Sequence, residues 1–88
     1  MKAIKFELKR DLEGLVLEDV STLKRVGTIK KEDNIFLRDE IIDNLLILEV
    51  DNPRERRRVY AIQKDWIFQN AKAFEIRHGK KIKEIKWF

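Results

Sequence analysis

The stretch of sequence that decides the fold class is IFLRDEIIDNLLILEV, residues 35–50. One interpretation is an amphipathic helix over residues 38–46. The other is a pair of strands over residues 35–42 and 45–50, joined by a turn at residues 43–44. We predict the strands, because the run LLILEV has the length and the uninterrupted apolar character of a buried strand.

Segments with strand-like patterns lie on both sides of this stretch. Ile4, Phe6 and Leu8 alternate with charged residues, which is the period-two pattern of a half-buried strand. Turn signals that contain Gly, Asn, Asp or Pro separate the segments at intervals of roughly eight to twelve residues. The remaining predicted strands cover residues 15–20, 23–29, 57–62, 71–77 and 82–87, and residues 66–68 form either a strand or a single helical turn.

Several residues carry finer expectations about these strands. Gly27, inside a predicted strand, indicates a β-bulge or a sharp bend. The strand over residues 71–77 is expected to bury Ala73 or Phe74 together with Ile76. Residues 78–80, His-Gly-Lys, predict a hairpin turn with Gly at the permissive position. The lysines that follow are typical of an edge strand.

The length of 88 residues fits one domain, residues 1–88, with a single small core. We therefore predict an all-β fold, and at this length a small closed or partly open barrel rather than a sandwich. Six to eight short strands and at most one short helix would build it. The chain has no Cys, which excludes disulfides, and we expect a cytoplasmic protein with no membrane segment. The high Lys, Glu and Arg content favours a thermophilic source.

Charge is distributed unevenly along the chain. Residues 1–51 hold 9 Lys and Arg against 12 Asp and Glu, whereas residues 52–88 hold 11 against 4. The second part therefore carries a net charge of +7 and the first part a net charge of −3, which together give the overall +4. Such an asymmetry favours an oriented electrostatic surface and an anionic partner, of which nucleic acid is the commonest. Alternatively, the two parts interleave in space, so that their opposite charges cancel and no oriented electrostatic surface results.

The strongest local signal is DNPRERRRVY, residues 51–60, where four arginines fall within five positions. Guanidinium groups match phosphate oxygens in a bidentate fashion. On a strand, Arg56 and Arg58 would face one side and Arg57 the other. Glu49 and Asp51 on the neighbouring strand offer the alternative, ordinary salt bridges. The predicted phosphate-binding residues are Arg54, Arg56, Arg57, Arg58 and Lys64.

Aromatic residues interleave with the basic part of the chain. Stacking of bases on aromatic rings beside a positive groove is how proteins bind single strands without strong sequence preference. We predict that Tyr60 and Trp66 stack bases. The predicted function is therefore a nucleic-acid-binding module, with RNA or another single strand favoured over sequence-specific duplex because no recognition helix is evident.

Catalysis is not expected, and neither is a cofactor or a metal. The single His, His78, is most simply an exposed turn residue, and no Gly-rich phosphate loop is present. A metal-dependent nuclease that uses Asp39, Glu40 and Asp43 is a distant alternative, because carboxylates at this spacing are usually a solvated face.

Residues 23–68 resemble the Sm-like family of RNA-binding barrels, which includes Sm, Lsm and Hfq proteins. LKRVGTIKKEDNIFLRDEII, residues 23–42, is similar to the first Sm motif, and VYAIQKDWIF, residues 59–68, to the second. The resemblance implies a five-stranded, strongly bent barrel of Sm-like or SH3-like type, a homo-oligomeric ring and RNA bases held near its pore. It would place Asp33 and Asn34 in the base-binding loop and Lys64 as a positive charge beside it.

A second resemblance supports a different function. LEGLVLEDVSTLKRVGTIKK, residues 12–31, followed by LLILEVD, residues 45–51, is similar to the pattern of PRC-type barrels, and generic SH3-like modules fit as well. Both imply protein–protein interaction or assembly without a nucleic-acid role. Strand 45–50 and the terminal pair Trp87–Phe88 would then be docking surfaces.

Overall fold

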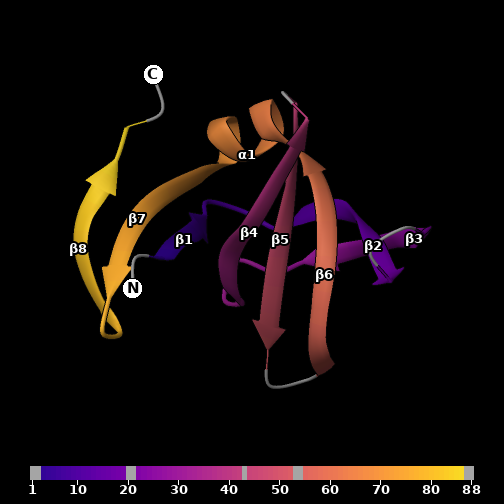
Figure 1. Cartoon of the computed structure of the whole chain (residues 1–88), viewed down its shortest axis with the longest axis horizontal. Coiled ribbons are helices and arrows are strands. Elements are labelled where there is room, and N and C mark those ends of the chain that lie inside the picture. Colours follow the sequence, from indigo (N-terminus) through magenta and orange to yellow (C-terminus); the bar gives the residue numbers. More distant parts are fainter. Residues whose placement is uncertain (1–2, 20–21, 43, 53–54, 87–88) are drawn as a thin grey trace.

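Eight β-strands and one short helix make up the described part of the chain (Figure 1). The structure is a computed structural model that describes residues 3–19, 22–42, 44–52 and 55–86; among these, the side chains of 18, 19, 22–24, 40–42, 55 and 56 are not described. The all-β prediction, with eight strands and one helix, is confirmed. The elements are β1 (Ala3–Leu8), β2 (Leu12–Asp19), β3 (Thr22–Ile29), β4 (Asn34–Ile42), β5 (Leu45–Asn52), β6 (Glu55–Gln63), α1 (Lys64–Asn70), β7 (Ala71–Arg77) and β8 (Lys80–Ile85).

The stretch that decides the fold is a β-hairpin, so the strand prediction is confirmed and the helical alternative is wrong. β4 and β5 pair in antiparallel fashion, with Ile35 opposite Val50 and Leu37 opposite Leu48. Leu46, Leu48 and Val50 alternate toward the core and are at most 1% exposed. Ile47, which points to the opposite face, is also buried. A strand buried on both faces reads as a continuous apolar run, and this is the pattern of LLILEV.

The strands form one antiparallel sheet with the order β3-β2-β6-β5-β4-β1-β7-β8. Three segments of this sheet are well paired: β3-β2, β6-β5-β4 and β1-β7-β8. Two short junctions join them, with three register pairs between β2 and β6 and two between β1 and β4. In Figure 1, β4, β5 and β6 run upright whereas β2 and β3 run across the picture, which is consistent with a change of strand direction at these junctions.

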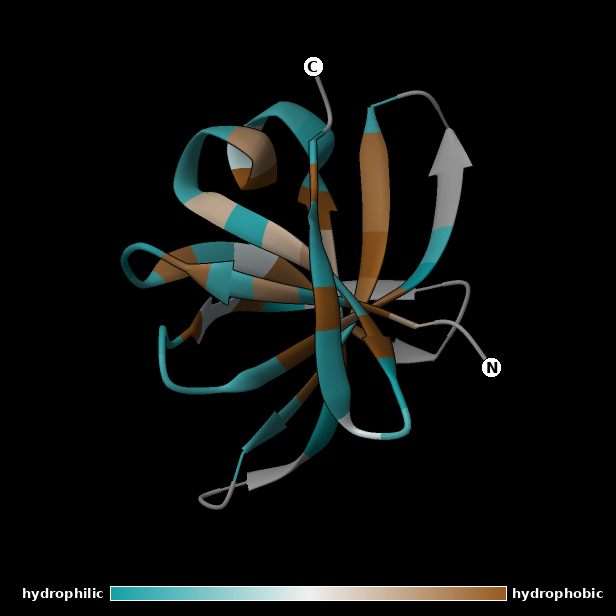
Figure 2. Ribbon diagram, turned by 90° about the vertical axis from the view of Figure 1, so that its left-hand side faces the viewer, coloured by the Kyte–Doolittle hydropathy of each residue, from teal (hydrophilic) through white to brown (hydrophobic). Residues whose placement is uncertain are grey.

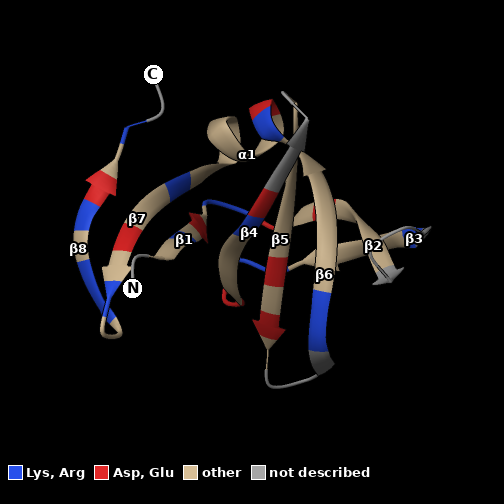
Figure 3. Cartoon of the chain, viewed as in Figure 1, with Lys and Arg blue, Asp and Glu red and all other residues tan. Residues whose placement is uncertain are grey.

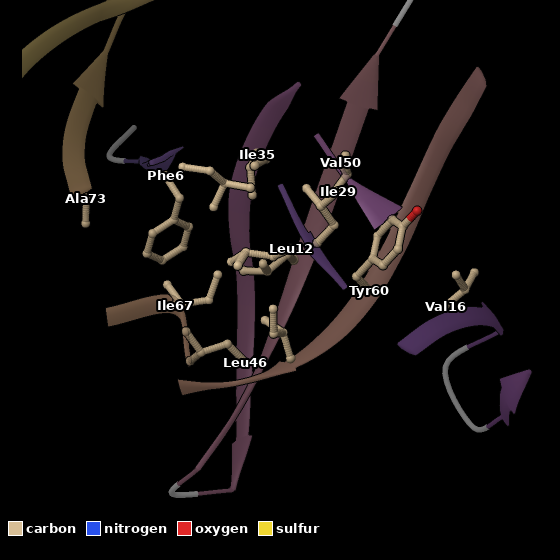
Figure 4. Close-up of a cluster of buried hydrophobic side chains, with 13 residues drawn as sticks. Phe6, Leu12, Val16, Ile29, Ile35, Leu46, Val50, Tyr60, Ile67 and Ala73 are labelled. Atoms are coloured by element: carbon tan, nitrogen blue, oxygen red, sulfur yellow. The ribbon is translucent and has the colours of Figure 1, made fainter. Parts of the chain in front are cut away.

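One apolar cluster receives side chains from all three segments and from α1, as Figure 4 shows. We call the side of the sheet that carries this cluster the core face and the opposite side the outer face. The apolar residues gather toward the middle of the molecule in Figure 2, and the ends of the elements are hydrophilic. The buried cluster consists of Phe6, Leu8, Leu12, Val16, Ile29, Ile35, Leu46, Leu48, Val50, Tyr60, Ile62, Ile67 and Ala73.

Gly27 does not mark a β-bulge, because the pairing of β2 with β3 is continuous there and places it opposite Gly14. The irregularities lie further along, between Val16 and Leu17 and beyond. Instead, the ring of Tyr60 covers the glycine pair. A Cβ added at Gly27 would lie 3.0 Å from the Tyr60 hydroxyl, and one added at Gly14 would lie 3.3 Å from the ring. An aromatic ring packed over strand glycines compensates for their missing side chains.

Helix α1 closes one end of the core through Ile67, which is 1% exposed. Of the two predictions for residues 66–68, the helical one is confirmed, although the helix is longer than a single turn. Asn70 ends the helix: its side-chain Nδ2 donates to the carbonyl oxygen of Trp66 at 2.9 Å. Its own carbonyl oxygen accepts a hydrogen bond from the backbone N–H of Lys9 at 2.8 Å, which ties the β1–β2 loop to the end of the helix.

The β7–β8 hairpin confirms the predicted turn and the lysine-rich edge strand. His78 and Gly79 have φ angles of 52° and 78°, the left-handed conformation that two-residue hairpin turns require. The expected burial of Ala73 is confirmed, whereas Phe74 and Ile76 are only half-buried. Ala73 points to the core face. Glu75, two residues further along the strand, points to the same face and is 5% exposed. Arg77 follows on the same side, and its Nε lies 3.1 Å from the Glu75 carboxylate.

Candidate nucleic-acid interface

The arginine run lies at the start of β6, beside the acidic end of β5 (Figure 3). Arg57 has an exposed side chain on the outer face, and its guanidinium is 3.9 Å from the Glu49 carboxylate. Arg38 of β4 approaches the same carboxylate at 3.8 Å. Glu49 therefore lies between two arginines from neighbouring strands. Ion pairs this long and this exposed contribute little stability, so both guanidiniums stay accessible to an anion.

Arg58 points to the other side of the strand, as predicted. It stands opposite Val50, a core residue, and is half-buried. Arg54 lies outside the described residues, as does the side chain of Arg56. Within the described part of the run, the structure thus supplies one exposed arginine on the outer face and one half-buried arginine at the border of the core face.

Two of the predicted site residues are buried, and both predictions need correction. Tyr60 is 4% exposed and belongs to the core, where its ring covers the glycine pair, so it cannot stack on a base in this conformation. Asp33 is 6% exposed, and its carboxylate accepts a hydrogen bond from the Lys30 backbone at 3.0 Å. Its carboxylate thus serves to close the β3–β4 turn. Asn34, the next residue, is exposed at the start of β4.

Trp66 is exposed, as a stacking residue must be. It lies in the first turn of α1 with 40% of its surface accessible. The guanidinium carbon of Arg10 lies 5.4 Å from the centroid of the Trp66 ring, within the range of a cation–π contact. Lys64 lies nearby in the same helix, and its Nζ is 5.5 Å from the ring of Phe68. Arg10 and the exposed indole thus meet at the start of α1, whereas Lys64 packs on Phe68 along the same helix.

Arg10 is the residue that reasoning from the sequence missed. It belongs to the β1–β2 loop, far from α1 along the chain, and no local motif links it to Trp66. The hydrogen bond from Lys9 to the end of α1 brings the two together. A contact of this kind depends on the tertiary fold, so no spacing in the sequence could have indicated it.

The predicted residues therefore separate into two groups at opposite ends of β6. Arg57 and Arg58 lie near its start, and Lys64 and Trp66 follow its last residue. Strand residues rise about 3.3 Å each, which places Arg57 and Gln63 on the order of 20 Å apart. A single mononucleotide could not contact both groups, whereas a strand of several nucleotides could.

A cleft of about 390 Å³ opens beside Trp66. It lies where β2 and β6 diverge, beyond their last register pair, Leu15 with Ala61. We call it the β2–β6 cleft. Leu15 and Val26 on its border are 38% and 57% exposed, which makes the cleft part of an apolar surface. The two polar side chains that line it are Glu13 of β2 and Gln63 of β6.

Neither a metal site nor a membrane helix is found in the part of the chain that the structure describes. No group of three or more His, Asp or Glu side chains gathers there as metal ligands would. Of the three acidic residues in the nuclease alternative, Asp39 is exposed, and the side chains of Glu40 and Asp43 lie outside the described ones. No described helix has the length and the apolar character needed to cross a bilayer.

No protein-family model, no curated protein and no solved structure matches this chain. The resemblance to Sm-like proteins therefore rests on residues 23–68 alone and stays a prediction.

Proposed function

We propose that this protein binds single-stranded nucleic acid, with RNA favoured, through the surface around α1. The observation that carries the proposal is the contact between Arg10 and the exposed ring of Trp66. An exposed indole provides a stacking surface that every base can use. A guanidinium beside it supplies a cation for the adjoining phosphate. Residues 52–88 carry a net charge of +7, the sign that attracts a phosphate backbone.

The start of β6 provides the second contact of the proposed interface. Arg57 shares Glu49 with Arg38, so an incoming phosphate would find two guanidiniums and one carboxylate there. This location lies on the order of 20 Å from Trp66 along β6. The bound strand would therefore run along β6, with phosphates neutralised at both ends and one base stacked at the α1 end.

A small, strongly bent barrel of Sm-like or SH3-like type is part of the same proposal. The supporting observations are the single core shared by three sheet segments and the short junctions between those segments. Barrels of this kind commonly present loops and strand ends to nucleic acid. Fold alone does not fix function, so the assignment rests on the residues around α1.

The test is fluorescence anisotropy of a labelled U-rich single-stranded RNA, titrated with the protein from low to moderate salt. We expect micromolar affinity at low salt and a log–log salt slope of about −0.7 for each neutralised phosphate. Trp66→Ala should weaken binding by roughly 10-fold or more, as expected for the loss of one stacked base. Arg10→Ala should weaken binding and flatten the salt slope by about 0.7.

The matched control is Lys83→Ala, which removes one exposed positive charge from β8, the edge strand separated from β6 by four strands in the sheet order. It should leave both affinity and slope close to those of the unaltered protein. The proposal is wrong if no salt-dependent binding occurs at low salt, or if the Arg10 and Trp66 variants bind no more weakly than the Lys83 variant.

A second candidate function is protein–protein interaction or self-assembly. The observation that favours it is the apolar surface at the β2–β6 cleft, where Leu15, Val26 and Trp66 are all exposed. Exposed apolar patches of this kind often mark interaction sites. Light scattering at high protein concentration would test self-assembly, because a strict monomer would count against a homo-oligomer.

A further inference from the structure

The β2–β6 cleft is a consequence of how the sheet is paired. β2 and β6 share register pairs only at Leu15, Val16 and Leu17 among the described residues. Beyond Leu15, β2 continues to pair with β3, and β6 continues to pair with β5. The two strands thus separate, and each turns an edge toward the gap. Backbone N–H and C=O groups on such edges are available to a ligand.

The lining of the cleft indicates the chemistry of its ligand. Trp66 offers a flat aromatic wall, and Leu15 and Val26 add apolar surface. The cleft contains no lysine or arginine among its described lining residues, so phosphate is not the group it would hold. Its one charged side chain is Glu13, and Gln63 stands on the opposite strand. These features suit a flat ring whose edge carries N–H donors.

We propose that the β2–β6 cleft binds one guanine base of the nucleic-acid strand; this inference rests on the function proposed above. Guanine is the base whose Watson–Crick edge carries two adjacent donors, N1–H and N2–H, which match the two oxygens of a carboxylate. Its neighbouring O6 accepts a hydrogen bond, which the amide of Gln63 can donate. Adenine, cytosine and uracil do not present two adjacent donors on that edge.

The size and position of the cleft are consistent with this occupant. A volume of about 390 Å³ lies at the small end of the range for ligand pockets and accommodates a two-ring base. Because Arg10 lies against Trp66, a base stacked on the indole would bring its own phosphate toward that guanidinium. The positive charge is thus placed where the backbone would run, and the carboxylate where the base edge would lie.

The test compares two labelled U-rich RNAs that differ in one central position, guanine in one and uracil in the other. We expect the guanine RNA to bind about tenfold more tightly, the preference that one carboxylate with a two-donor match supplies. Glu13→Gln should remove most of this preference. The readout is the ratio of the two affinities, because removing a negative charge raises the affinity for every RNA. Glu84→Gln on β8 is the matched control and should leave the ratio unchanged.

A second measurement separates failure of this inference from failure of the proposed function. In the Trp87→Phe variant, Trp66 is the only tryptophan, and guanosine monophosphate should quench its fluorescence more than the other three nucleotides do. Equal, salt-dependent binding of both RNAs would overturn the guanine site and leave the nucleic-acid function standing. Quenching by guanosine monophosphate that needs Glu13, without RNA binding, would support the site and overturn the function. A preference that survives Glu13→Gln would overturn the role of Glu13.

Discussion

At Gly27, an added methyl group would meet two side chains at once. The nearest atoms to a Cβ there are Val16 Cγ2 at 2.9 Å and the Tyr60 hydroxyl at 3.0 Å. Real Cβ atoms do not approach neighbours this closely in an unstrained structure. The glycine therefore serves close packing, and the tyrosine predicted to stack bases instead fills the space that two glycines leave free.

We predict that Gly27→Ala lowers the free energy of unfolding by about 1–3 kcal/mol, the usual cost of overpacking a core. Urea denaturation measures this loss. In a protein that already carries Val16→Ala, Gly27→Ala should cost less stability than it does in the unaltered protein, because the shorter side chain removes the closest contact. If the two substitutions simply add, crowding against Val16 is not the cause.

At the scale of one element, the end of α1 is held by one side-chain and one backbone hydrogen bond of Asn70. Asn70 donates to the Trp66 carbonyl and accepts from Lys9, so it joins the last turn of the helix to the β1–β2 loop. Since Arg10 follows Lys9, the same contacts position the guanidinium at the Trp66 ring. The candidate interface is thus held in place by a residue that does not belong to it.

We predict that Asn70→Asp destabilises the protein by about 1–3 kcal/mol, because a buried carboxylate cannot donate to the Trp66 carbonyl. Thermal denaturation gives the loss of stability. Asp65→Asn is a suitable control, since this neighbouring residue of α1 is exposed. Unaltered stability of the Asn70 variant would mean that the helix end is held by other contacts.

The strands were predictable because the sequence patterns that indicate them are local. The candidate binding site was not predictable, because it is built from residues far apart in the sequence. Alternation in Ile4, Phe6 and Leu8, and the apolar run of β5, report directly on burial. The Arg10–Trp66 contact and the β2–β6 cleft depend on strands that meet from distant parts of the sequence. Tyr60 shows the same difficulty: its residue type suits both a core and a stacking surface, and only the glycine pair beneath it decides.

Across the whole molecule, strands that are distant in sequence are neighbours in the sheet. β1 pairs with both β4 and β7, and β2 pairs with β6. Such a topology requires large loops to close before the pairing stabilises the chain, and this slows folding. We predict that refolding in stopped-flow measurements takes milliseconds to seconds, as for other all-β domains. Complete refolding within the dead time of the instrument would contradict this expectation.

The three register pairs between β2 and β6 also give the molecule a mechanical weak point. Within the described residues, the β2–β3 hairpin is joined to β6 by this short ladder and by the packing of Leu12, Val16 and Ile29 into the core. A force that pulls the β2–β3 hairpin away from β6 would meet little resistance, since few backbone hydrogen bonds join the two. The junction beside which the cleft opens is therefore also a place where the sheet can separate, and a ligand bound across both strands would oppose that separation.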